Sequence, residues 1–139
     1  MDPFIIIARG DVVEVNEMLR SLSKPEVNQV RSFSGFSMLH RAAQLGNTDV
    51  CELLIVHGAE INARSTRGWL TPLHLALGNG YIETAMLLLD KYAKPWLKNK
   101  SKEDAFTYGA KRGYITACTD LKDRVVKAEL TKKLGQIVG

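Results

Sequence analysis

Residues 68–79 read Gly-Trp-Leu-Thr-Pro-Leu-His-Leu-Ala-Leu-Gly-Asn, and this stretch predicts a short helix with a defined start. Thr71 is an N-cap residue whose hydroxyl can accept a hydrogen bond from an unpaired backbone N–H. Pro72 follows at the first helical position, where its missing N–H costs nothing and its φ already suits a helix. Gly80 then allows a tight turn. A second helix is predicted over residues 81–89.

The same unit occurs 34 residues earlier in the chain. Residues 37–43 read Ser-Met-Leu-His-Arg-Ala-Ala, and they place His40 in register with His74 and Gly46 in register with Gly80. A helix–turn–helix unit that recurs at this period is typical of a repeat array. Two copies in register, with matching glycines, are not plausibly a coincidence.

These motifs resemble the ankyrin repeat family, whose unit of about 33 residues opens its first helix with Thr-Pro-Leu-His-x-Ala. The resemblance implies an all-α fold, a solenoid of stacked antiparallel helix pairs with β-turn fingers. Gly35 and Gly68 are 33 residues apart, so the extra residue in the spacing lies at Trp69-Leu70. The resemblance is strong over residues 32–97 and weak at both ends.

We expect one domain over residues 1–139, because no flexible linker or low-complexity segment interrupts the chain. Terminal repeats are expected to be atypical because one side of each has no neighbour. The approximate boundaries are 2–31 for the N-terminal repeat, then 32–64, 65–97 and 98–122, with a C-terminal capping helix over 123–135. Met1 and the atypical ends favour a small standalone protein.

The weaker repeats carry local substitutions with structural consequences. Tyr92 stands where the family has a capping glycine, and Lys102 stands where the other fingers have glycine. Asp104 can cap a helix in place of threonine. The stretch Ser23-Lys24-Pro25 predicts a non-helical connection, because the residue before a proline is disfavoured in the α region.

The C-terminal segment carries apolar residues on one predicted helical face. Val126, Leu130, Leu134 and Ile137 recur at spacings of four, four and three. They predict a long or paired helix that closes the stack and ends near Gly135.

Composition excludes several classes of protein. The 139 residues are 45% hydrophobic and 24% charged, which is ordinary for a globular domain, and no apolar run is long enough to cross a bilayer. Cys51 and Cys118 lie among apolar residues, so we expect free buried thiols in a reducing compartment, the cytoplasm or the nucleus. The net charge is −2 over residues 1–64 and +6 over residues 65–139.

The residues that could carry catalysis have simpler structural roles. The resemblance implies that His40 and His74 bond within and between neighbouring repeats. No Cys-x₂-Cys metal spacing, phosphate loop, nucleophile elbow or dinucleotide motif is present. We therefore expect no enzyme, no catalytic or metal-binding residue, and no cofactor.

Binding remains as the function, and the variable positions of the family indicate where. These are the finger tips and the residues beside the glycine between the two helices. The predicted partner-binding residues are Phe33, Ser34, Phe36, Gln44, Leu45, Thr66, Arg67, Trp69, Asn79, Lys100, Lys111 and Arg112.

Large aromatic residues and arginine often dominate protein interfaces. Phe36 and Trp69 could instead pack within the array, and both alternatives stay open at this point. The basic residues beside the aromatics favour a partner protein with an acidic and partly apolar segment.

The leading hypothesis is a non-catalytic protein–protein interaction module, an adaptor, regulator or assembly factor that binds through finger tips and the concave face. We expect a monomer without membrane insertion. The alternative is a nucleic-acid-associated protein that uses the basic C-terminal half. Only Trp96 lies among the lysines there, whereas single-strand binding grooves space several aromatics among basic residues.

Overall fold

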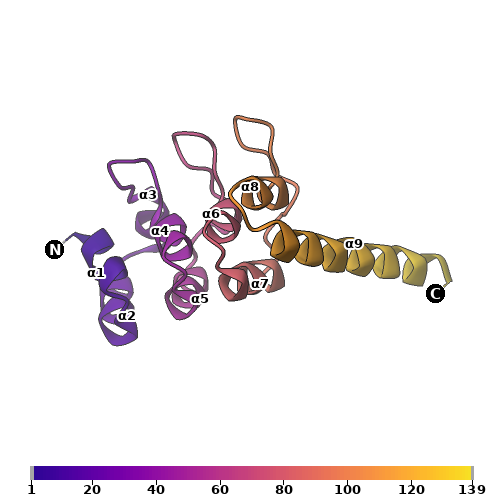
Figure 1. Cartoon of the computed structure of the whole chain (residues 1–139). Helices are drawn as coiled ribbons and strands as arrows, with labels where there is room; N and C mark the ends of the chain where they lie inside the picture. The colour runs from indigo at the N-terminus through magenta and orange to yellow at the C-terminus, as the bar shows by residue number, and fades with distance from the viewer. Residues whose placement is uncertain (1, 139) are drawn as a thin grey trace.

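The computed structural model describes residues 2–138. Within these residues the regular elements are helices, and one isolated antiparallel β-bridge pairs Arg31 with Ser37. The helices are α1 (Pro3–Arg9), α2 (Val12–Arg20), α3 (Lys24–Gln29), α4 (Met38–Gln44), α5 (Thr48–Val56), α6 (Pro72–Gly78), α7 (Ile82–Asp90), α8 (Ala105–Lys111) and α9 (Ile115–Val138). Successive antiparallel pairs stand side by side, and three loops project from one edge of the row (Figure 1). This arrangement confirms the predicted all-α solenoid.

The first helix of each inner repeat begins as its sequence predicts. The Thr71 hydroxyl accepts a hydrogen bond from the backbone N–H of His74 at 3.3 Å, with Pro72 at the first helical position. Ser37 caps α4 in the same way. The predicted cap at Asp104 is also confirmed, because its carboxylate accepts from the backbone N–H of Thr107 at 2.8 Å.

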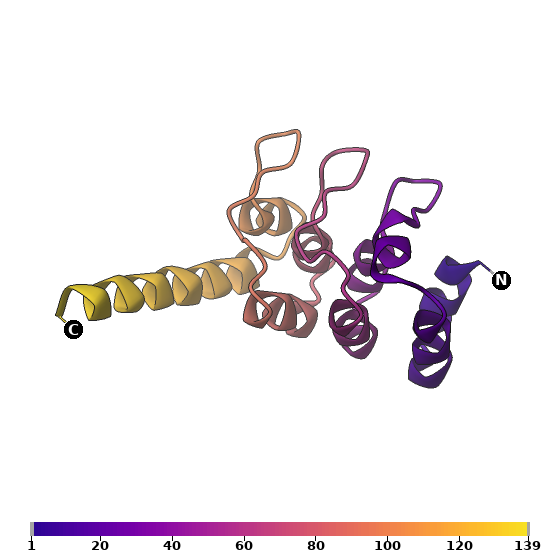
Figure 2. The same ribbon diagram turned by 180° about the vertical axis from the view of Figure 1, so that it is seen from behind.

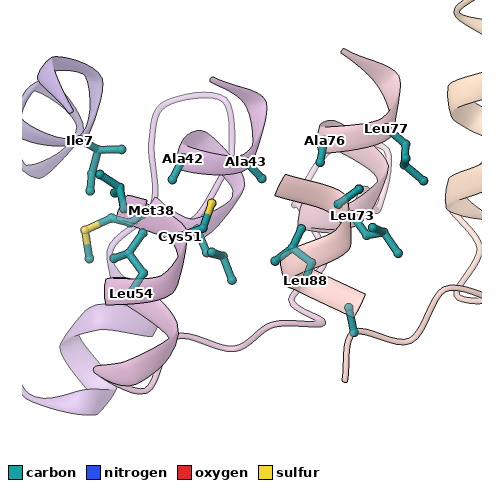
Figure 3. Packing of buried hydrophobic residues seen from close by; sticks show 14 of the residues in the cluster. Ile7, Met38, Ala42, Ala43, Cys51, Leu54, Leu73, Ala76, Leu77 and Leu88 are labelled. Atoms are coloured by element: carbon teal, nitrogen blue, oxygen red, sulfur yellow. The ribbon is translucent and has the colours of Figure 1, made fainter. Parts of the chain in front are cut away.

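The core is built from contacts between neighbouring repeats. The first helices pack in the order α1, α4, α6 and α8, and the second helices α2, α5 and α7 pack beneath them. Figure 3 shows side chains such as Met38, Leu54 and Leu88 filling the space between helix pairs. Each pair buries its apolar face only against its neighbours, so stability follows a nearest-neighbour sum.

The three projecting loops are β-turn fingers that are hydrogen-bonded to one another. The backbone N–H of Thr66 donates to the carbonyl of Gly35 at 3.2 Å, and that of Lys100 donates to the carbonyl of Gly68 at 3.0 Å. Each finger therefore holds the tip of the next one in place.

The base of each finger is closed by one backbone bond, and these bonds locate the inserted residue. The bond runs from residue 32 to 36 in the first finger and from 99 to 103 in the third, but from 65 to 70 in the second. The extra residue is accommodated at Trp69, which takes a left-handed φ of 55° directly after Gly68. The predicted insertion at Trp69-Leu70 is thus confirmed.

Two residues other than glycine adopt a left-handed backbone conformation at positions where the other repeats have glycine. Tyr92 has φ 69° and Lys102 has φ 62°. The left-handed region costs a residue with a Cβ roughly 1–2 kcal/mol. The neighbouring structure thus imposes the repeat geometry on unsuitable residues.

The prediction of a non-helical connection at Ser23-Lys24-Pro25 was wrong. The short helix α3 begins at Lys24, and the Ser23 hydroxyl accepts from the backbone N–H of Glu26 at 3.3 Å. Proline is tolerated in the first turn of a helix, because the N–H that it lacks has no partner there in any case. The serine cap outweighs the mild restriction on the residue before proline.

Of the two alternatives predicted for the C-terminal segment, a long or a paired helix, the long helix is observed. One helix, α9, runs from Ile115 through Gly135 to Val138 and projects past the last repeat (Figure 2). The residues expected to close the stack are exposed, from 38% for Val126 to 80% for Ile137.

The reason that α9 continues lies in one residue. Val125 stands in register with Gly58 and Tyr92, which end α5 and α7 with φ values of 94° and 69°. A β-branched residue strongly disfavours a positive φ, so the helix does not stop at Val125. The helix instead continues for 13 more residues, from position 125 to its end at Val138.

Candidate functional site

Two buried histidines position the fingers. In His74, Nδ1 accepts from the backbone N–H of Thr71 at 3.2 Å, so the proton is assigned to Nε2, which donates to the carbonyl of Glu103 at 2.9 Å. His40 repeats the arrangement and donates from Nε2 to the carbonyl of Leu70 at 2.7 Å. Each ring thereby ties one repeat to the finger of the next, which confirms the predicted structural role.

The same burial keeps both rings neutral. Loss of hydration lowers the pKa of His40 to about 4 and also lowers the pKa of His74. A proton on Nδ1 would face the backbone N–H that now donates to it. The two histidines are therefore fixed hydrogen-bonding groups in the structure.

The finger tips are open to solvent. Phe33 is 100% exposed at the tip of the first finger, beside the exposed Ser34. Thr66 and Arg67 are exposed on the second finger, and Lys100 is exposed on the third. Because the fingers are bonded to one another, these side chains share one continuous edge of the molecule (Figure 1).

Trp69 is the centre of this edge. The residue is 47% exposed, and two cations lie over its ring, the Arg64 guanidinium 5.8 Å and the Lys100 ammonium 5.4 Å from the ring centroid. Cations over an aromatic face are attracted by the ring quadrupole. The indole is thus oriented by its neighbours while part of its surface stays accessible.

Phe36 has a different environment from the other finger aromatics. It is partly buried and stacks on His40, with ring centroids 5.6 Å apart and planes 14° apart. Of the two alternatives for Phe36, packing within the array is the one observed. Phe36 supports the finger that presents Phe33.

The remaining predicted residues form a second group at the C-terminal ends of the first helices. Gln44 accepts from Arg41 at 2.6 Å, and Leu45 follows as the C-cap of α4. Asn79 ends α6 and donates to the carbonyl of Leu75 at 2.8 Å. These positions are partly or fully exposed.

The fourth repeat contributes basic residues that are already engaged. Lys111 forms an ion pair with Glu103 at 2.7 Å, and the Arg112 guanidinium lies 5.0 Å from the ring centroid of Tyr108. The hydrogen bond from Lys111, followed by that from Asn99, lowers the pKa of the Glu103 carboxyl. Lys111 is therefore already paired with a carboxylate.

Two residues at this surface were missed by sequence reasoning: Arg64 and Tyr108. Arg64 directly precedes the second finger, and its basic character beside Arg67 was the available signal. Tyr108 packs against Gly78, since a Cβ built on that glycine would lie 2.4 Å from the tyrosine ring. No family motif marks this pair.

Other site types have no support in the part of the chain that the structure describes. Within residues 2–138, no three His, Cys, Asp or Glu side chains gather as a metal site would require, and no helix is both long and apolar enough to traverse a bilayer. Cys51 and Cys118 are free and buried, as predicted. Burial raises the pKa of the Cys51 thiol to about 12.

The stacked helix pairs and projecting fingers define a helical repeat protein, and comparison with known proteins specifies which kind. A family model described as ankyrin repeats (3 copies) matches residues 3–99. The chain therefore belongs to the ankyrin repeat family.

Individual relatives share the repeats over part of their length. The chain is 34% identical over 97 residues to the NF-kappa-B inhibitor cactus of Drosophila yakuba, covering 70% of this chain and 19% of that protein. It is 36% identical over 83 residues to protein phosphatase 1 regulatory subunit 27 of Mus musculus, covering 60% and 52%. The aligned part thus spans about half or less of these relatives.

Proposed function

We propose that this chain is a non-catalytic protein–protein interaction module that binds its partner with the finger edge and the adjoining ends of the first helices. The observation that carries the proposal is Trp69, an accessible indole that Arg64 and Lys100 contact on fingers that are hydrogen-bonded into one edge. Rigid aromatic anchors with flanking arginine are the side chains that contribute most to binding energy at interfaces.

The charges of the finger edge favour an acidic partner segment. Arg64, Arg67 and Lys100 are exposed around the indole, whereas the nearby Glu103 is already paired with Lys111. Positive surfaces of this kind attract negative ones and steer their approach. The exposed Phe33 adds an apolar contact, so the segment is expected to be partly apolar as well.

The broader role that we propose is that of an adaptor or regulator which acts as a monomer in the cytoplasm or nucleus. Ankyrin repeats support protein interaction in general, and two of the relatives are by name an inhibitor and a regulatory subunit. The partners of those proteins are not carried over to this chain. The two free thiols are consistent with a reducing compartment.

A comparative pull-down tests the proposal. The wild type is compared with a Trp69→Ala/Arg67→Glu variant and with a Val56→Ala control, since Val56 is 70% exposed on α5 at the opposite side of the helix pairs. Proteins retained by the wild type and the control but lost from the finger variant, with an unchanged helical circular dichroism spectrum, are the expected result.

Two outcomes would oppose the proposal. One is a set of bound proteins that both variants retain equally. The other is binding of bare DNA or RNA with a steep dependence on salt, which would favour the nucleic-acid alternative. A protein partner held by an apolar and acidic contact is expected to show a shallower salt dependence.

A further inference from the structure

A second surface lies on the side of the second helices, at the C-terminal end of the array. A groove of about 830 Å³ runs between α7, the connection that follows it, and α9. Its walls are mostly apolar and include Met86, Leu89, Trp96, Leu121 and Val125. None of these residues belongs to the finger edge.

The groove exists because α9 departs from the repeat pattern. α5 packs on both α2 and α7, whereas the main packing partner of α9 is α8. The start of α9 keeps the register, and Cys118 and Leu121 are buried like their counterparts in α7. Asp123 is in register with Asp90, the last residue of α7. Beyond Asp123 the helix α9 continues, and this continuation forms one wall of the groove.

The opposite wall is fixed to α9 by a tryptophan. The Trp96 indole Nε1 donates to Glu129 Oε1 at 3.1 Å, and its ring lies 5.5 Å from that of Phe106 between centroids. Trp96 thus spans from the connection to the projecting helix. This hydrogen bond links the two walls of the groove.

Tyr92 presents its ring at this surface under unusual conditions. It lines the groove, is 88% exposed, and takes the left-handed φ of 69° that glycine would adopt without strain. The backbone of Tyr92 is therefore strained, while its side chain stays almost fully exposed in the described structure. Strain of this kind gathers at binding sites, where a contact outside the chain can compensate for it.

The rim of the groove is basic. Lys94, Arg124 and Lys132 line it, and none of the three forms an ion pair within residues 2–138. Two acidic residues, Asp90 and Glu129, also line the groove, and Glu129 keeps its charge while it accepts a hydrogen bond from Trp96. The three cations outnumber these two carboxylates, which leaves the rim with a net positive charge.

From these observations we propose that the groove binds an acidic amphipathic helix of a partner protein. The α9 wall from Leu121 to Lys132 spans 12 residues, which corresponds to about 18 Å or three helical turns. An apolar stripe at spacings of three and four residues fits such a groove, and flanking carboxylates would meet the basic rim.

The charge of the rim also favours an acidic helix over a second copy of the chain as the ligand of the groove. The exposed apolar stripe of α9, from Val126 to Ile137, is the segment that another copy could insert. It is flanked by Lys127 and Lys133, so it would bring lysines against a basic rim. Like charges placed together across an interface oppose association.

The probe for the test is a fluorescein-labelled 16-residue peptide with leucines at helical spacings of three and four and glutamate or alanine elsewhere. A matched peptide carries lysine in place of every glutamate. Fluorescence anisotropy with the full chain is expected to show saturable binding of the acidic peptide and little binding of the lysine peptide.

Variants then locate the site. Tyr92→Gly removes the ring and the strain together, so the urea midpoint is expected to stay or rise while peptide affinity falls about tenfold. Lys132→Glu is expected to weaken binding as well. The Val56→Ala control, altered on α5 outside both surfaces, is expected to bind the peptide as the wild type does, whereas loss of binding in the Trp69→Ala/Arg67→Glu variant alone would assign the peptide to the finger edge.

Each contrary result overturns the proposal. Absence of saturable binding, equal binding of both peptides, or an unchanged affinity in Tyr92→Gly would show that the groove does not bind an acidic helix. Sedimentation of the peptide-free chain provides the remaining test. A dimer that forms with rising concentration and is lost in Tyr92→Gly would assign the groove to a second copy.

Discussion

Acidification from pH 6.5 to 5 is expected to destabilise the array by protonating a histidine that the fold keeps neutral. The His40 ring is fully buried, and both of its nitrogens are engaged, one by Ser37 and the other by the carbonyl of Leu70. Its pKa is about 4 in the folded chain against 6.5 as the ordinary value. In this pH range the unfolded chain binds more protons than the folded one, so stability rises with pH and falls on acidification.

The magnitude follows from these two pKa values. With 6.5 in the unfolded state and about 4 in the folded state, the free energy of unfolding falls by about 1.6 kcal/mol between pH 6.5 and pH 5. His74, whose pKa is also lowered by burial, adds to the loss in the same direction. Glu103, whose pKa is lowered below 4.5, contributes only at more acidic pH.

Urea unfolding followed by circular dichroism at pH 6.5, 5.75 and 5 measures the effect. At m values of about 1–3 kcal/mol/M, the midpoint is expected to fall by roughly 0.5–1.5 M across this range. The His40→Gln variant lacks the titrating ring, so its stability is expected to be lower at pH 6.5 but to change less with pH. A wild-type midpoint that is constant from pH 6.5 to 5, or a variant with the same slope, would refute the reasoning.

Three further predictions concern stability and reactivity. Gly109→Ala is expected to lower the free energy of unfolding by about 1–3 kcal/mol in urea, because the new Cβ would lie 2.5 Å from the Cys118 sulfur; an unchanged midpoint would contradict this. Lys102→Gly is expected to raise stability by about 0.5–1 kcal/mol by relieving its left-handed φ, whereas the control Lys98→Gly, outside that region, is expected to lower it. Thiol labelling of Cys51 by a disulfide reagent is expected to be slow in the native state and fast in urea, and rapid native labelling would contradict its burial.

The inner repeats could be predicted from sequence because their signals are local. The threonine–proline start at Thr71 and Pro72, the histidine at the third helical position and the glycine turns each act within a few residues. The insertion could even be located at Trp69 from the spacing of Gly35 and Gly68. Local hydrogen bonding and backbone preference decide these features, and both can be read from one sequence.

The end of the chain could be predicted only in part: the sequence indicated a long or paired helix, but not that the apolar face of this helix stays exposed. The apolar spacing of Val126 to Ile137 suggested a buried face, but burial needs a neighbouring element, and periodicity does not show whether one is present. The better signal was Val125, a β-branched residue in register with the position where Gly58 and Tyr92 turn left-handed. Its consequence, a continuous α9 and an open groove, requires the register of all three repeats.

The candidate site was partly within reach of the sequence. The family positions correctly indicated exposed tips such as Phe33, but they did not separate it from Phe36, which stacks on His40. They also did not predict that Lys111 is paired with Glu103 while Lys100 lies over Trp69. The contact between Lys100 and Trp69 joins two adjacent fingers and is set by how neighbouring repeats stack. The contacts Phe36–His40 and Lys111–Glu103 form within one repeat and depend on side-chain conformations that a sequence pattern does not specify.

Site-specific photo-crosslinking tests the central claim, that this scaffold binds its partner with the finger edge. A photoreactive benzoylphenylalanine replaces Phe33 in one protein and Val56 in another, since both side chains are exposed and lie on opposite sides of the helix pairs. Specific adducts with a partner protein from position 33, and none from position 56, are the predicted result. Adducts only from position 56, or equally from both positions, would contradict the account.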